Sequence, residues 1–362
     1  MLRFSKILFY FTVILLLLWQ LPWCYNFFTA KSSKSGFVLY SSVIGDFVIT
    51  GQQEGKDGKE GKIVVRHDLS GHKYTQDEVD SILPMFYCRQ LMSDERFPDS
   101  INGVEVTPRL VQTENFVFKI TPTDLNTPHI GLYPLLESMS GRVELEMPKD
   151  VFRITDKGIE FVDMATNSIE PAKNALFTEA LTKKGFHFPA VEITGNPTTR
   201  KEYDEGYVLL DANRQLFHLK QMKGRPYVRA VDVPHGVELK HLFITEFKSR
   251  KTLALLTDKN HSLYVLTTPY EIKKVAVPSF DPEKETLSII GNLFDWTLRI
   301  TSLEEDNYFA VRADDFSLIK TMKNPAVEET LAQKIGDYIF PVRISFTSNF
   351  DNFVKPRFND GL

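Results

Sequence analysis

Few residues in this sequence have types and spacings that could support chemistry. The segment HDLSGH places His67, Asp68 and His72 close together, and in a turn both imidazoles could approach one metal ion. A third ligand is not evident, so we favour a solvated turn. His235 and His241 likewise lack an evident third metal ligand. We therefore expect neither a metal nor a cofactor.

Nucleophilic and acid-base catalysis are also weakly indicated. Cys88 lies in an apolar helical segment, where a buried structural thiol is the simpler interpretation. The acidic pairs Glu304–Glu305 and Asp314–Asp315 fall in expected turns, where solvation explains them. No phosphate-binding loop, dinucleotide fingerprint, HExxH or GxSxG motif occurs. We favour a non-enzymatic protein and leave enzymatic activity open.

A cluster of basic and aromatic residues is the best candidate for a binding surface. The segments GNPTTRKEYDEGY and MKGRPYVR carry Arg200, Lys201, Arg225, Tyr227 and Arg229 near the ends of expected strands. Arginine and tyrosine at loop ends are typical anchors of protein contacts. We predict a partner-contact surface at Arg200, Arg225, Tyr227 and Arg229, with an ordinary polar rim as the alternative.

Composition limits the classes of partner. The chain has 362 residues with a net charge of -4, 43% hydrophobic and 25% charged residues. A mildly acidic chain without a basic stripe argues against nucleic-acid binding, which needs clustered Lys and Arg. The two cysteines, Cys24 and Cys88, exclude a disulfide scaffold of several bridges.

The N-terminus is the strongest single signal. Residues 7–30 carry no charge, follow Arg3 and Lys6, and include Trp19 and Trp23. About 20 apolar residues span a bilayer as a helix, and tryptophans favour the interface. We predict that residues 1–30 are an uncleaved membrane anchor. A cleaved signal peptide and a buried core helix are the alternatives.

The anchor predicts where the remaining chain lies. Long C-terminal domains translocate largely regardless of their charge. We therefore expect a single-pass protein of the bacterial cytoplasmic (inner) membrane, with residues 31–362 facing the periplasm.

The sequence of residues 31–362, which we call the body, predicts a mainly β fold of repeated units. Three stretches, at about 190–234, 239–278 and 286–325, each offer four β-rich runs, period-two alternation and a terminal proline. Four strands in about 45 residues match one β-propeller blade. We predict a propeller-like body with a few inserted helices and a less regular, helix-containing insert at 75–130. A β-sandwich is the alternative.

Two further expectations concern individual segments. Thr75 and Glu78 have the spacing of a capping box, and Pro84 should kink or divide the helix that follows. The C-terminal stretch VRISFTSNFDNFVKPRFNDGL begins a further unit and then stops. The N-terminal strands of FVLYSSVIGDFVITG could complete that blade and close the ring.

Several long phrases resemble a bacterial family of unknown function: LLLLWQLPWCYNFFTAKSSKSGFVLYSSVIGDFVI, DSILPMFYCRQLMSDERFPDSI, MPKDVFRITDKGIEFVDM and NPTTRKEYDEGY. Members of that family are single-anchor membrane proteins associated with genes for ABC-type transporters. The resemblance implies an accessory or scaffold role in a transport complex, acting by protein contact. A periplasmic ligand-binding protein or hydrolase that uses the propeller mouth is the alternative, and a membrane-bound sensor is a third.

Overall fold

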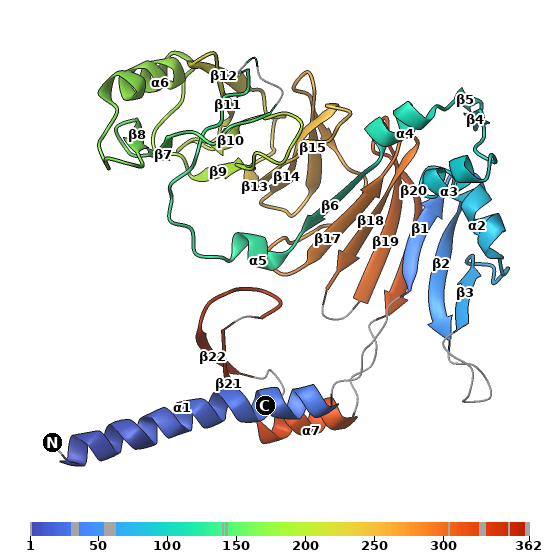
Figure 1. The fold of residues 1–362 in the computed structure, drawn as a ribbon, viewed down its shortest axis with the longest axis horizontal. Helices are drawn as coiled ribbons and strands as arrows, with labels where there is room; N and C mark the ends of the chain where they lie inside the picture. The colour runs from blue at the N-terminus through green and yellow to red at the C-terminus, as the bar shows by residue number, and fades with distance from the viewer. Residues whose placement is uncertain are drawn as a thin grey trace.

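The computed structural model describes residues 2–29, 36–53, 63–139, 141, 144–302, 305–325, 331–346 and 348–358. The chain is mainly β and carries one long apolar helix, α1 (Leu2–Thr29), at its N-terminus, which confirms these two expectations. Figure 1 shows the sheets formed by residues 37–325 arranged one after another in an arc, with α1 lying apart from them.

Three antiparallel meanders form the centre of this arc. In each, every strand pairs with the next strand in sequence. The first meander contains β9 (Glu192–Gly195), β10 (Tyr207–Leu210), β11 (Leu216–Met222) and β12 (Arg225–Val231). The second contains β13 (Leu239–Ile244), β14 (Thr252–Asp258), β15 (Leu263–Thr267) and β16 (Ile272–Lys274). The third contains β17 (Thr286–Gly291), β18 (Asp295–Thr301), β19 (Glu305–Arg312) and β20 (Leu318–Pro325).

A strand from the predicted irregular insert joins the third meander. β6 (Phe116–Ile120) pairs antiparallel with β17, so this sheet has five strands. Phe116 lies opposite Gly291, where an added Cβ would meet the Phe116 ring at 2.3 Å. The glycine therefore leaves space for the Phe116 ring, which any side chain at position 291 would meet.

One turn is used at equivalent places in the first two meanders. Asp258 ends β14, and its Oδ1 accepts hydrogen bonds from the backbone N–H groups of Asn260 and Ser262, at 2.9 and 2.8 Å. Asp211 does the same for Asn213 and Gln215, at 2.8 and 2.9 Å. An aspartate that accepts from its own turn stabilises a tight reversal between strands.

The cores lie between the faces of successive sheets. In β10, Val208 and Leu210 pack toward the second meander, whereas Leu209 packs toward α6 (Pro171–Lys183) and the hairpin of β7 (Asp150–Ile154) and β8 (Ile159–Asp163). A strand that is buried on both faces must be apolar throughout, as YVLL is. The second meander packs on the third in the same way.

The last sheet of the arc comes from the N-terminal part of the body. It contains β1 (Phe37–Ser41), β2 (Asp46–Gln53) and β3 (Ile63–His67), and β1 and β2 pack against β19 through a cluster that includes Val38, Phe47 and Tyr308. α2 (Gln76–Ile82) packs on the other side of this sheet through Val79. The elements that follow form a separate cluster, which includes Cys88, Ile101 and Val111 and packs on Phe294: α3 (Cys88–Ser93), β4 (Ser100–Ile101), β5 (Val104–Glu105) and α4 (Pro108–Glu114). The short helix α5 (Pro122–Leu125) follows β6.

The local predictions for the first of these helices are confirmed. Thr75 caps α2, and both hydrogen bonds of the capping box with Glu78 are present. α2 ends at Ile82, with Leu83 as its C-cap, immediately before Pro84. A proline cannot donate to the helical ladder, which explains why α2 and α3 are separate helices.

The suggested ring closure is wrong for the strands that the structure describes. β1, β2 and β3 pair among themselves, while β21 (Val342–Ser345) pairs with β22 (Lys355–Phe358). β21 instead lies against α1, together with α7 (Leu331–Ile339). The C-terminal strands therefore do not join β1–β3 in a further blade, and no closed ring forms among the described sheets.

Candidate partner-contact surface

Three of the four predicted contact residues lie on one face of β12. Arg225, Tyr227 and Arg229 alternate along this edge strand, so their side chains point to the same side. Their cross-strand neighbours are Met222, Lys220 and His218, respectively. Arg225 and Arg229 are exposed, and Tyr227 is half-buried.

The second meander holds two of these side chains in place. The Arg229 guanidinium carbon lies 4.4 Å from the centre of the Tyr270 ring, and the Tyr227 hydroxyl lies 3.1 Å from that of Tyr270. The Tyr270 hydroxyl is also 2.9 Å from His218 Nδ1. Tyr227 and Arg229 are thus ordered where the first two meanders meet, which favours their use as rigid contact anchors.

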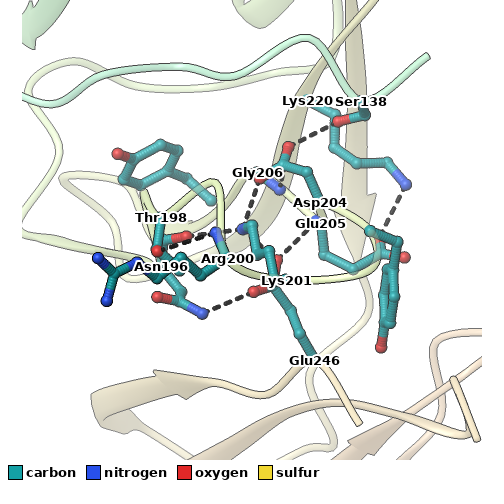
Figure 2. Close-up of polar contacts among 12 residues, drawn as sticks. Ser138, Asn196, Thr198, Arg200, Lys201, Asp204, Glu205, Gly206, Lys220 and Glu246 are labelled. Carbon is teal, nitrogen blue, oxygen red and sulfur yellow. Dashed lines mark hydrogen bonds and ion pairs between the residues drawn. The ribbon is translucent and has the colours of Figure 1, made fainter. Parts of the chain in front are cut away.

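A buried group of charges lies beside this surface (Figure 2). Lys201 Nζ is 2.7 Å from Asp204 Oδ1 and 2.6 Å from Glu246 Oε1, and it donates to the Asn196 carbonyl oxygen at 2.6 Å. The side chains of Lys201, Asp204 and Glu246 are 8%, 2% and 4% exposed. Burial raises the pKa of Glu246, although Lys201 opposes this shift.

The remaining oxygen atoms of this group are also satisfied. Asp204 Oδ2 accepts from the Ser138 hydroxyl at 2.7 Å and from the Gly206 N–H at 3.0 Å. Glu246 Oε2 accepts from the Asn196 side-chain amide at 2.8 Å. Because Glu246 follows β13 and the other charges belong to the loop before β10, the group joins the first two meanders. Complete pairing indicates a structural joint rather than a reactive centre.

His218 extends this polar region into the first meander. Its Nε2 lies 2.6 Å from the Glu205 carbonyl oxygen, and Lys220 Nζ lies 2.7 Å from Glu205 Oε2. Burial lowers the pKa of His218 to about 4. A neutral imidazole with both nitrogens engaged is poorly suited to general base catalysis at neutral pH.

Arg200 and Lys201 are separated from the surface on β12. Figure 2 shows the exposed Arg200 side chain pointing away from Lys220, while Lys201 points into the buried group. The structure therefore brings Tyr227 and Arg229 together, places Arg225 on the same face, and leaves Arg200 on the loop that follows β9. Their role in partner contact remains a prediction.

The histidine-rich segment forms a turn of the type seen in the meanders. Asp68 Oδ1 accepts from the Ser70 hydroxyl and the His72 N–H, at 2.6 and 3.0 Å, and Oδ2 accepts from the Tyr74 hydroxyl at 2.8 Å. The Ser70 hydrogen bond is the main cause that lowers the pKa of Asp68 to about 2. Both carboxylate oxygens thus serve the turn. Within the described ranges, no group of three His, Cys, Asp or Glu side chains could hold a metal ion.

The other candidates from the sequence have local partners. Cys88 is buried on α3, and His241 Nε2 lies 3.1 Å from Glu283 Oε1. Asp314 accepts from Arg312 at 3.2 Å, and Asp315 accepts from the Ser317 hydroxyl at 2.6 Å. The exposed side chain of His235 lies on the turn before β13, and Glu304 lies outside the described residues.

Sequence reasoning missed two features of this region. Lys201 was grouped with surface residues, but it is buried, because Asp204 and the distant Glu246 neutralise it. The second feature is the shared aspartate turn. Its signal was present in DANRQL and DKNHSL, where an aspartate stands two residues before an asparagine and four before a polar residue.

Together, these features define a mainly β protein of stacked antiparallel sheets, with an apolar helix before them and no assembled catalytic group among the described residues. The chain belongs to the family described as "Domain of unknown function (DUF4857)", whose model matches residues 37–311. No curated protein sequence matches it as a relative.

Three solved structures show weak similarity to the chain. PorZ, a surface component of the type-IX secretion system of Porphyromonas gingivalis, is 12% identical, with a TM-score of 0.25. The comparison covers 82% of this chain and 28% of PorZ. The Cps50 (Swd1) β-propeller domain of Myceliophteria thermophila is 9% identical over 83% of this chain and 88% of that one, with a TM-score of 0.25. Dihydro-heme d1 dehydrogenase NirN is 11% identical over 63% and 56%, with a TM-score of 0.21.

Proposed function

We propose that this protein is a membrane-anchored, extracytoplasmic accessory or scaffold of an ABC-type transport complex and acts by protein contact. The observation that carries the proposal is α1. From Arg3 to Thr29 it is long and apolar enough to cross a membrane, and little of it is buried. A helix that carries apolar side chains on every side and makes few contacts with the rest of the protein is stable when lipid surrounds it.

Packing of the C-terminus on α1 favours a retained anchor over a cleaved signal. The Tyr25 hydroxyl donates to the Ala332 carbonyl oxygen at 2.8 Å, and an added Cβ at Gly336 would meet the Tyr25 ring at 2.6 Å. The Trp19 and Phe346 rings are centred 5.0 Å apart. Removal of α1 would expose the surfaces of α7 and β21 that now contact it.

α7 also continues the apolar surface of α1. Leu331, Ile335, Tyr338 and Ile339 recur on one face of α7 and are 80%, 50%, 78% and 53% exposed. The uncharged part of α1 begins at Ile7, after Arg3 and Lys6. At 1.5 Å per residue, a hydrocarbon core of about 30 Å takes about 20 residues and therefore extends to about Asn26, beside α7. α7 is thus at the depth of the headgroups.

The body supplies the contact platform. We infer that the stacked sheets form an open, propeller-like arc on the periplasmic side of the bacterial inner membrane. The ordered residues on β12 offer cationic and aromatic anchors to a partner. The likeness to a family associated with ABC-type transporter genes supports a transport complex as that partner.

Charge reversal on β12 tests the proposal. We expect Arg225→Glu with Arg229→Glu to lower recovery of transporter subunits at least fivefold when the full-length protein is purified from native membranes in mild detergent. Both side chains are exposed, so the fold should persist, as thermal unfolding would check. Lys157→Glu with Lys184→Glu reverses two exposed charges near α6 and serves as the control. If both double variants recover equal amounts of the transporter subunits, β12 is not the contact surface.

A further inference from the structure

A cavity of about 320 Å³ lies on the side of the third meander that faces the N-terminal part of the body. Its walls come from β1 and the turn after it, the segment between α2 and α3, and the paired ends of β6 and β17. Phe86 and Val117, which are 43% and 71% exposed, stand at its opening. This volume is at the lower end of the range for small-molecule sites.

Two buried oxygen atoms in the cavity wall lack hydrogen-bond donors. Asp295 is 1% exposed, and its Oδ1 accepts from the Asn292 side-chain amide at 3.2 Å. The Ser42 hydroxyl is near enough to lower the pKa of this carboxyl, but no described residue donates to Oδ2 with hydrogen-bond geometry. Asn115 donates its amide to the Met85 carbonyl oxygen at 2.6 Å, and its Oδ1 has no donor in the described part of the chain. Buried polar atoms are nearly always paired, so two acceptors in one wall point to a missing donor.

The charge of the wall indicates what kind of donor is missing. Among the described residues, no Lys, Arg or His side chain lines the cavity, and Asp295 is its one acidic residue. Burial raises the pKa of this carboxyl to about 7, and its charge contributes to the raised pKa of Tyr40. A ligand that brings a positive charge would compensate the carboxylate for its lost hydration, whereas an anion would be repelled.

The remaining wall is apolar and partly aromatic. Tyr40, Phe86 and Phe116 line the cavity together with aliphatic side chains from α2 and β17. We propose that this cavity binds a small organic amine, with its ammonium group at Asp295 and Asn115 and its apolar body between the aromatic side chains. This site lies apart from β12 and does not depend on the proposed transport partner.

Calorimetric titration of the full-length protein in detergent tests this proposal with three probes of similar shape: phenethylamine, 2-phenylethanol and 3-phenylpropionate. We expect saturable binding of phenethylamine, at least tenfold weaker binding of the alcohol, and none of the acid. Asp295→Asn keeps the size of the side chain but removes its charge, and it should weaken amine binding at least tenfold.

A second variant tests the proposal even if Asp295→Asn does not fold. Val117→Arg places a cation at the exposed opening and should weaken amine binding several-fold without disturbing the core. Ile319→Arg, on an exposed site of β20, is the matched control and should bind as the unmodified protein does. No saturable amine binding, a preference for the acid, or equal affinity in Asp295→Asn would each overturn the proposal.

Discussion

Buried charges, rather than apolar side chains alone, join the first two meanders. Lys201 compensates Asp204 and Glu246 at a site from which water is nearly excluded. Loss of one partner from a buried ion group leaves an uncompensated charge, which costs far more than the pair contributes by its presence. This charged group and the contacts of Tyr227 and Arg229 with Tyr270 both lie where the first two meanders meet.

Lys201→Met should lower the free energy of unfolding by about 3 kcal/mol, because Asp204 and Glu246 would remain buried without a cation. Thermal or urea unfolding of the full-length protein in detergent would measure the change. Lys248→Met is the matched control, since Lys248 contacts Glu202 at 2.6 Å with side chains 56% and 63% exposed. Its effect should stay within about 0.5 kcal/mol, and an equal effect of both variants would contradict the structural role of Lys201.

His218 predicts a pH dependence of stability. Its pKa falls from 6.5 to about 4 on folding, so the unfolded chain takes up the proton first as the pH decreases. The stability contribution of neutral His218 is complete above about pH 6.5 and is lost as the pH falls toward 4, by up to about 3 kcal/mol.

Urea unfolding at several pH values between about 7 and 4.5 would measure this dependence. The decrease in stability should be shallower in His218→Gln, whereas His235→Gln, at an exposed position, should retain the slope of the unmodified protein. If His218→Gln and the unmodified protein show the same slope, His218 is not the group responsible.

At the scale of elements, local sequence signals predicted helix starts better than strand partners. The capping box at Thr75 and the break at Pro84 depend on neighbouring residues, and both are confirmed. By contrast, the strands of 342–358 alternate like those of a blade, yet they pair with each other, and β21 lies on α1. Alternation shows that a strand has two unlike faces but does not identify what covers them.

The exposed face of α7 provides a test at this scale. We expect an environment-sensitive nitrobenzoxadiazole label at Ile335→Cys, in full-length protein lacking Cys24 and Cys88 and reconstituted in vesicles, to emit at shorter wavelength and to be quenched by lipids with a nitroxide near the headgroup. The same label at Gln333→Cys, an exposed position on the opposite face of α7, should report water. Equal, water-like emission from both sites would show that α7 lies away from lipid, even if α1 retains the protein in the vesicles.

For the whole molecule, the sequence predicted a mainly β body behind an apolar helix, and both are present. The strands of the three meanders lie within 190–234, 239–278 and 286–325, because each strand pairs with its sequence neighbour and leaves a periodic local pattern. The pairing of β6 with β17 joins segments far apart in the sequence and left no such pattern. The cavity beside Asp295 depends on the same long-range pairing, so no local sequence pattern indicates it.

The whole molecule offers contacts in three places: the exposed apolar faces of α1 and α7, the face of β12, and the cavity beside Asp295. The proposed transport role uses the helices and β12 but not the cavity.

The proposed role as a membrane-anchored accessory of a transport complex is tested most directly by mass spectrometry. The unmodified full-length chain is extracted from native membranes in mild detergent, and the proteins that co-purify with it are identified. We expect ABC-type transporter subunits in stoichiometric amount, together with a chain whose intact mass still includes residues 1–30. Recovery of a solitary chain, or of one that lacks α1, would contradict it.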